Sequence, residues 1–498
     1  MPAYEDLNED LNEAERLVRE AFPAGAKVDL TDRAEPERTV RAAVLRALLL
    51  GDRQGGPAAG GALRLTGARI TGQLDLAGAR VEHELRLERC ELEQQVLLRG
   101  AALRSTGFIG CRIPGLDGWL ATVDGNLFLQ DSVIDGRLTL TRAHVIGELR
   151  LSGVRLTATE LLGAGPADPA RAPATWALWA GGLELDGGCF ARGGFTARGG
   201  LRLVGARFNG GLFMEGALID NAGGDALTGD DLTASTMVLA DGFTARGAIR
   251  LPGAAVRSVL SLAGAVLDGG GTALDGSRLH AGELRLTPAR LPTGTVDLHE
   301  AQVAVLRDND ASWPADSRLD GLAYTSLQGD AARPVPVARR LEWLAGLPGY
   351  SPQPYEQLAA WYRKTGDDEA ARQVLLAKQR RRRRTLNPLG RAWGRLLDVT
   401  VGYGYRPWQA GIWLLGLTVL GTAAFSSGSP TAVQSEQRAP FSALVYTLDL
   451  LLPIGGFGQR TAWYWTGLHQ WLGYGLIAAG WLLTTSLLAG MSRSLSRQ

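Results

Sequence analysis

The chain has almost no lysine: Lys27, Lys364 and Lys378 are the only ones among 498 residues. Arginine therefore carries the positive charge and nearly balances the acidic residues, to a formal net charge of +1. This balance indicates neither a nucleic-acid-binding protein nor a disordered chain. The first twenty residues also lack the basic start and the apolar stretch of a signal peptide.

Cysteine is equally scarce. Cys90, Cys111 and Cys189 form no CxxC motif, and an odd number argues against a disulfide framework, so we expect a reducing compartment. No group of residues has the spacing of a metal site. Dinucleotide fingerprints, Walker A motifs and nucleophile elbows are also missing. The sequence therefore offers no catalytic, cofactor-binding or metal-binding residue, and it favours a protein without enzymatic activity.

Glycine is abundant, with 66 residues, and it recurs within an internal repeat. The pattern Leu63-Arg64-Leu65 returns every eleven residues, at Leu74, Leu85 and Val96. The consensus L-x-L-x-G-A-x-I/V-x-G-x describes a short strand, a glycine at a corner and a small inward alanine. One such unit buries nothing alone, so only a stacked array is stable. We predict a β-solenoid over residues 62–306, with two units and about 22 residues per coil.

The repeat region, roughly residues 62–305, resembles the pentapeptide-repeat proteins, with one extra residue in each pair of units. This resemblance implies a right-handed, four-sided β-helix. Irregular stretches at 155–182 and 219–236 are expected to loop out of it. Residues 1–55 are expected to cap its first coil with two helices, over 4–20 and 33–50. Asp32 and Glu35 would form a capping box for the second helix.

Beyond residue 320 the sequence pattern becomes typical of helices. We expect a helical hairpin and an arginine-rich juxtamembrane region over 320–398. Polybasic clusters beside a membrane attract anionic lipid headgroups. Nucleic-acid binding is disfavoured, because no groove or reading motif accompanies the arginines. The expected lipid-contacting residues are Arg380, Arg381, Arg382, Arg383, Arg384, Arg391 and Arg395.

Residues 408–491 are expected to form a membrane domain. Two apolar runs, 408–425 and 468–491, are long enough to cross a bilayer. Arginines flank both outer ends, so the positive-inside rule places both termini and the solenoid in the cytoplasm, against a bacterial cytoplasmic membrane. The overall prediction is a mixed fold: a helical cap, a solenoid, a helical hairpin and a two-span tail.

The segment 441–453, between the two spans, is too short to cross and is expected to be a re-entrant or interfacial helix. The glycine-rich stretch after it resembles the filter of potassium channels, although Pro453 and Gln459 depart from that pattern. Asp449 would face an ion path or lie at the membrane interface, paired with Arg460. The candidate pore residues are Asp449, Pro453, Gly455, Gly456, Phe457 and Gly458.

The whole chain also resembles a group of bacterial proteins labelled membrane-associated oxidoreductases. Arg41–Leu50, Pro354–Arg383 and Tyr446–Gln459 carry this resemblance. It implies a nicotinamide or flavin cofactor, for which the sequence has no binding motif.

Three hypotheses follow. In the first, which we favour, the solenoid binds an unknown protein partner as a scaffold at the inner membrane face. In the second, residues 408–491 form a pore as a homo-oligomer. In the third, the chain is an oxidoreductase.

Overall fold

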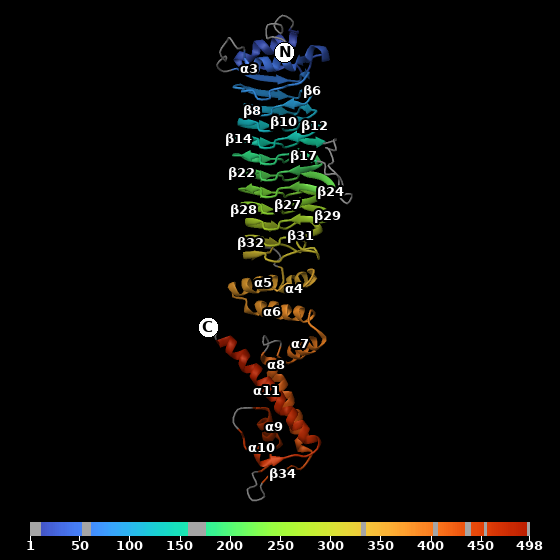
Figure 1. The fold of residues 1–498 in the computed structure, drawn as a ribbon, viewed down its shortest axis with the longest axis vertical. Helices are drawn as coiled ribbons and strands as arrows, with labels where there is room; N and C mark the ends of the chain where they lie inside the picture. Colours follow the sequence, from blue (N-terminus) through green and yellow to red (C-terminus); the bar gives the residue numbers. More distant parts are fainter. Residues whose placement is uncertain are drawn as a thin grey trace. The chain divides into compact units, whose positions relative to one another are not determined.

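The chain forms two compact units, Met1–Gly349 and Tyr350–Gln498 (Figure 1). The computed structural model describes residues 11–51, 61–157, 176–329, 335–401, 407–433, 440–452 and 456–495.

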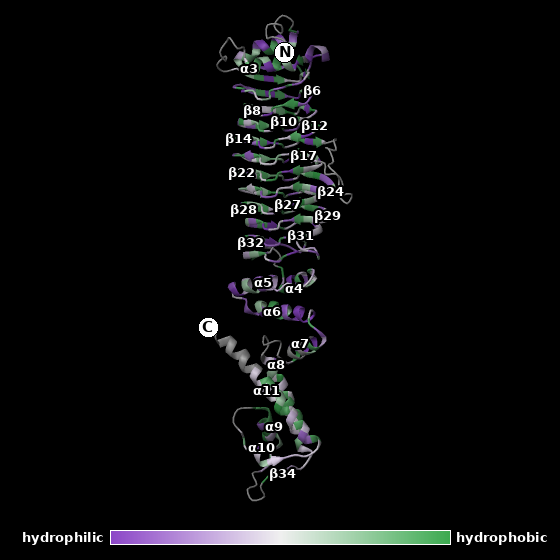
Figure 2. Cartoon of the chain, viewed as in Figure 1, coloured by the Kyte–Doolittle hydropathy of each residue, from purple (hydrophilic) through white to green (hydrophobic). Residues whose placement is uncertain are grey.

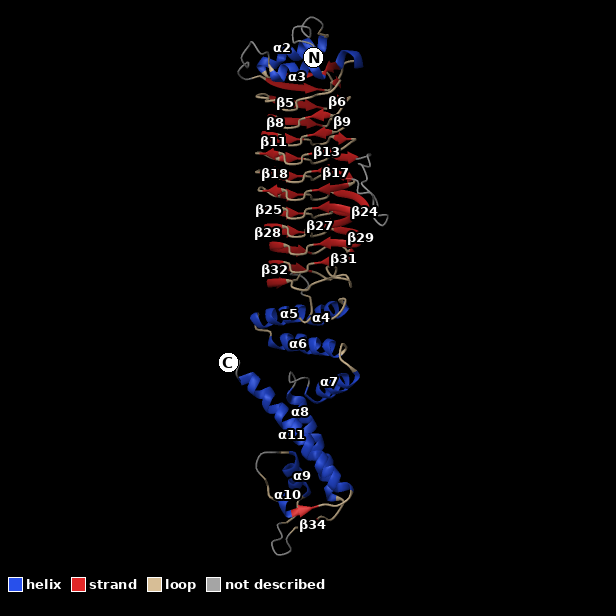
Figure 3. Cartoon of the chain, viewed as in Figure 1, coloured by secondary structure: helices blue, strands red, loops and turns tan. Residues whose placement is uncertain are grey.

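The first unit is built on a β-solenoid of about 11 turns over residues 62–328 (Figure 3). Successive coils pair in parallel, so that Leu63 lies opposite Leu85, 22 residues later. A coil such as Leu138–Thr157 contains four short strands, two in each of two long sheets. The predicted solenoid and its coil length are therefore confirmed.

The two sheets run along the whole solenoid. The 17-stranded sheet contains β1 (Lys27–Asp29), β3 (Ala62–Thr66), β5 (Glu84–Glu88), β8 (Ala102–Ile109), β11 (Thr122–Phe128), β14 (His144–Val145), β15 (Leu149–Arg150), β18 (Glu184–Leu185), β19 (Cys189–Phe190), β22 (Arg207–Phe208), β23 (Leu212–Phe213), β25 (Thr233–Ala234), β26 (Met237–Val238), β28 (Ala255–Ser261), β30 (His280–Leu286), β32 (Gln302–Asp308) and β33 (Ala323–Gln328). The 16-stranded sheet contains β2 (Thr39–Arg41), β4 (Arg69–Thr71), β6 (Glu91–Leu92), β7 (Val96–Leu97), β9 (Arg112–Ile113), β10 (Leu116–Asp117), β12 (Val133–Ile134), β13 (Leu138–Thr139), β16 (Arg155–Thr157), β17 (Trp176–Trp179), β20 (Thr196–Arg198), β21 (Gly200–Arg202), β24 (Leu218–Thr228), β27 (Thr244–Arg250), β29 (Val266–Asp275) and β31 (Thr293–Asp297).

The core of the solenoid follows from the alternation of each L-x-L strand. In β5, Leu85 and Leu87 point inward, whereas Arg86 between them points outward. Each fully buried leucine contributes about 1.5–3 kcal/mol of hydrophobic stabilisation. The inward column that begins at Leu63 continues through Leu85, Thr106, Leu127, Leu149, Cys189, Leu212, Met237, Leu260, Leu284, Leu306 and Leu327.

The corners have the predicted glycine only in part, since Arg89 and Asp131 adopt φ values of +51° and +57° at the position that Gly67 takes in the first coil. Gly67 adopts a φ of +70°, and its Cβ would lie 2.6 Å from Thr31, so only glycine fits there. At the small inward position that follows this corner, Ala68 is succeeded in the next coils by Cys90, Cys111 and Ser132.

The predicted cap is correct in kind but wrong in its details. The first helix, α2, is Glu13–Ala21, and its capping box joins Asn12 to Glu15. Residues 35–38 form the 3-10 helix η2 and not the first turn of the predicted α-helix over 33–50. Strand β2 follows and pairs with β4. The second helix, α3 (Ala42–Leu50), begins only after this strand, because Val40 is needed opposite Ile70 to cover the first full coil. Another 3-10 turn, η1 (Phe22–Ala24), follows α2, and residues 4–10 of the predicted first helix lie outside the described part of the chain.

Two other predicted boundaries need correction. The solenoid continues past residue 306, because β33 adds to β32 and extends the array to residue 328. The stretch 219–236 does not loop out: most of it belongs to β24, which pairs with β20, β21 and β27. Its glycines allow the strand to bulge while keeping the ladder. In the other predicted loop, residues 158–175 lie outside the described part of the chain.

A buried carboxylate–arginine pair stands at each end of the solenoid. Glu15 of α2 accepts hydrogen bonds from the guanidinium and the backbone N–H of Arg41, at the end of β2. Asp308 of β32 accepts two from Arg340 of helix α4 (Val337–Gly346). Each pair fastens a terminal helix to the strands it adjoins.

The second unit is helical, apart from a two-stranded pairing of β34 (Thr431–Ala432) with β35 (Trp463–Tyr464). Figure 2 shows that its hydrophobic residues are concentrated in the last helices. Its helices are α5 (Gln353–Lys364), α6 (Asp368–Arg383), α7 (Pro388–Val401), α8 (Pro407–Ser426), α9 (Ala443–Leu451), α10 (Gln459–Ala462) and α11 (Leu468–Leu495).

Candidate functional site

Helix α8 has the length and hydropathy needed to cross a bilayer, over Trp408–Ser426, which matches the predicted first span. Only 17% of the most apolar stretch of this helix is buried. Ile412, Leu415 and Val419 are each more than half exposed. Helix α8 therefore presents an exposed apolar surface, larger than that of a core helix.

The predicted second span forms a helix, α11, but α8 is the only helix within the described residues that meets the criteria for a span. His469, Gln470 and Arg493 make α11 less apolar. Its exposed residues still include Trp471 and Trp481. Whether it crosses a membrane stays a prediction.

Helix α9 lies against both α8 and α11, at the place predicted for a re-entrant helix. A Cβ on Gly421 of α8 would come within 2.5 Å of Thr447, and one on Gly480 of α11 would meet the carbonyl oxygen of Leu451 at 2.1 Å. Small residues that allow such close approach are typical of helix packing in membranes. Phe425, Tyr446 and Trp465 form the aromatic centre of this packing.

Asp449 is buried, at 1% exposure, and its carboxylate is held by its own chain. Oδ1 accepts a hydrogen bond from the backbone N–H of Phe457 at 2.9 Å, and Oδ2 accepts one from that of Arg460 at 2.8 Å. Asp449 therefore fastens the returning loop to α9. The expected contact with Arg460 is present, but it involves the backbone rather than the guanidinium.

The filter-like residues are only partly described. Gly458 adopts a φ of +77° and precedes α10, whereas Phe457 is 55% exposed. Gly456 lies near Asp449, with its Cβ position 3.7 Å from Oδ1. Pro453 and Gly455 lie outside the described residues. The described residues thus form a turn closed by Asp449.

The arginine cluster divides into two groups. Arg380 and Arg383 of α6 both pair with Asp398 of α7, at 3.0 Å each, and so hold the two helices together. Arg381 has interactions of its own. Arg380 is still 49% exposed, and the other arginines of the cluster with exposed side chains are Arg382, Arg384, Arg391 and Arg395. The cluster is therefore partly structural, which its run of identical residues did not reveal.

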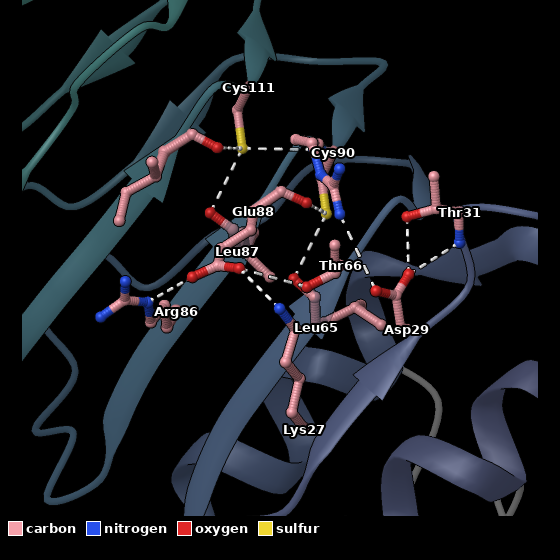
Figure 4. A network of polar contacts seen from close by, with 12 residues as sticks. Lys27, Asp29, Thr31, Leu65, Thr66, Arg86, Leu87, Glu88, Cys90 and Cys111 are labelled. Atoms are coloured by element: carbon pink, nitrogen blue, oxygen red, sulfur yellow. Dashed lines mark hydrogen bonds and ion pairs between the residues drawn. The ribbon is translucent and has the colours of Figure 1, made fainter.

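A polar network at the capped end of the solenoid was not predicted (Figure 4). Glu88 accepts hydrogen bonds from Lys27 at 2.9 Å and from Arg86 at 2.7 Å, and these bonds lower the pKa of its carboxyl group. On the neighbouring strand, Arg64 lies opposite both Lys27 and Arg86, and it donates a hydrogen bond to Glu84 at 2.7 Å. A cavity of about 300 Å³ opens here, lined by Lys27, Arg64, Leu65, Thr66, Arg86 and Glu88.

The sequence held part of the signal for this cavity. Arg64 and Arg86 are 22 residues apart, one coil, so the repeat could have placed them side by side. Lys27 precedes the repeat and gives no such cue.

The three cysteines are buried and reduced. Burial raises the pKa of Cys189 to about 12. The hydrogen bond with Cys90, together with burial, raises the pKa of Cys111, which therefore stays a thiol. Among the described residues, no three His, Cys, Asp or Glu side chains converge to hold a metal ion.

The fold defines this chain as a β-solenoid protein with a helical C-terminal region. Searches against protein-family models, curated proteins and solved structures gave no match.

Proposed function

We propose that the chain is a membrane-anchored scaffold: the C-terminal helices enter the bilayer, and the solenoid binds a protein partner. The observation that carries this proposal is the outward apolar surface of α8, where Leu415 and Val419 are 66% and 63% exposed. A bilayer would cover such a surface. The solenoid supplies a rigid face of stacked strands, the usual basis of binding by repeat proteins.

The orientation follows from charge. Arg382, Arg384, Arg391 and Arg395 precede α8, and Arg493 lies near the end of α11. If both helices span the membrane, these residues lie on one side, which the positive-inside rule makes the cytoplasm. We also propose right-handed winding of the solenoid, the hand of nearly all connections between parallel strands.

Membrane fractionation of the full chain tests the anchor. We expect the wild type to stay with bacterial membranes through an alkaline carbonate wash. The double variant Leu415→Arg/Val419→Arg should leave the membrane fraction, because each arginine costs about 2.5–3.5 kcal/mol at the centre of a span. Gln373→Arg, at an exposed position of α6, is the matched control and should behave as wild type. Release of the wild type by carbonate would refute the anchor.

The pore alternative has less support, because Asp449 already serves two backbone N–H groups of its own chain. Light scattering of the detergent-solubilised chain separates the two hypotheses. A tetramer would give α9 a central axis to line, whereas a monomer would leave no closed path for an ion.

A further inference from the structure

We propose that the cavity at the capped end of the solenoid binds a small molecule that carries phosphate groups. This proposal is independent of the membrane anchor. It starts from the register of the strands: Arg64 on β3 lies directly opposite Lys27 on β1 and, on its other side, directly opposite Arg86 on β5. Adjacent strands are about 4.8 Å apart, and like charges directly opposite each other are destabilising.

The carboxylates of Glu84 and Glu88 occupy only a few of the N–H donors of these arginines. Arg86 donates to Glu88 through Nε alone, and Arg64 donates to Glu84 through Nη2 alone, within the described part of the chain. Each guanidinium has five N–H donors. Four donors on each arginine therefore remain for a ligand.

Arg64 and Arg86 both line the cavity, so a ligand bound there would lie beside these donors. The lining of the cavity holds three cations against one carboxylate, Glu88. In the next coil, Gly107 takes the position opposite Arg86 and adds no side chain, and Phe128 follows it, so the column of cations ends at Arg86. A volume of about 300 Å³ suits a small molecule.

Phosphate is the class that this donor set fits best. The planar guanidinium matches phosphate oxygens in a bidentate manner, and two arginines with a lysine can satisfy several oxyanions at once. A bound dianion would also offset the repulsion within the column. Glu88 would keep Lys27 and Arg86 positioned at the rim, because its lowered pKa keeps it ionised at neutral pH.

Calorimetric titration of the full-length, detergent-solubilised chain with pyrophosphate, in a phosphate-free buffer of fixed ionic strength, tests the site. We expect saturable binding of one pyrophosphate per chain. Arg64→Gln and Arg86→Gln should each weaken it about tenfold, and Lys27→Gln should also weaken it. Circular dichroism should show the same β content in all variants.

The matched control is Arg285→Gln. Arg285 lies in the same outward column near the other end of the solenoid and pairs with Glu283 as Arg86 pairs with Glu88. It should leave binding unchanged. Failure of the wild type to bind, equal weakening by Arg285→Gln, or equally tight binding of citrate would each overturn the assignment.

Discussion

Asp308 and Arg340 form a buried bidentate ion pair, with Nη1–Oδ2 and Nη2–Oδ1 distances of 2.7 and 2.9 Å. Trp313 adds a third hydrogen bond to the same carboxylate, at 3.1 Å. The pair joins β32, in the last full coil, to α4. Solenoids need such a closure, because the terminal coil has no further neighbour to cover it.

Removal of this arginine should open the end of the solenoid. Arg340→Ala leaves Asp308 without its counter-ion in a buried site, which costs about 3–5 kcal/mol. We expect faster hydrogen exchange in β32 and β33 and a lower urea midpoint for the first unit. Arg339→Ala is the control, because the neighbouring Arg339 is exposed, pairs with the surface carboxylates of Asp310 and Glu342 and lies over the ring of Trp343. Equal effects of the two substitutions would show that Asp308 does not depend on its partner.

The Glu15–Arg41 pair at the other end of the solenoid should lose its stabilising effect in acid. Burial opposes the ionisation of Glu15, but hydrogen bonds from Arg41 and Asn12 outweigh it, so the pKa of Glu15 is lowered. The unfolded chain therefore binds this proton more readily than the folded one. Glu15 contributes its stability above about pH 4.3, the value for the unfolded chain, and loses it as the pH falls through the folded pKa.

Hydrogen exchange of α2 as a function of pH measures this effect. Glu15→Gln should speed exchange at neutral pH, and its difference from the wild type should shrink below about pH 4. Glu13→Gln is the control, since Glu13 makes an exposed pair with Arg33. A difference that does not change with pH would mean that the charge of Glu15 is unimportant.

Substitution of Asp449 should loosen the turn after α9. Asp449→Ala leaves the N–H groups of Phe457 and Arg460 without their acceptors, at a cost of about 1–3 kcal/mol. Proteolysis at residues 456–462 of the detergent-solubilised chain should accelerate. Asp449→Asn, which keeps one acceptor oxygen, should have a smaller effect. If both variants resist proteolysis as the wild type does, the two hydrogen bonds are dispensable.

The exposed arginines should govern attraction to anionic lipid. Arg382→Gln/Arg384→Gln should weaken binding to vesicles containing phosphatidylglycerol by about 1 kcal/mol per residue, and less so at high salt. A double control, Arg257→Gln/Arg290→Gln, removes two exposed arginines from the solenoid unit. Co-sedimentation that falls equally in both double variants would point to net charge rather than to this cluster.

The solenoid could be predicted because its signal is local and repeated: every L-x-L strand buries the same two positions. The start of α3 could not, since residues 39–41 adopt a strand only because Val40 meets Ile70, a partner thirty residues away. The Asp308–Arg340 pair has the same character, because its members are 32 positions apart in the sequence and no repeat relates them. Asp398 likewise forms ion pairs with Arg380 and Arg383 but not with their neighbours, a difference that the uniform run of arginines did not reveal.

The two-unit coil also restricts how the length of this protein can change. Loss or gain of 22 residues, the separation of Leu63 and Leu85, shortens or lengthens the solenoid by about 4.8 Å and leaves every face aligned. Loss of a single eleven-residue unit would turn everything beyond it by half a revolution and send outward columns to the opposite side. Any surface that spans several coils can therefore be inherited only in whole-coil steps.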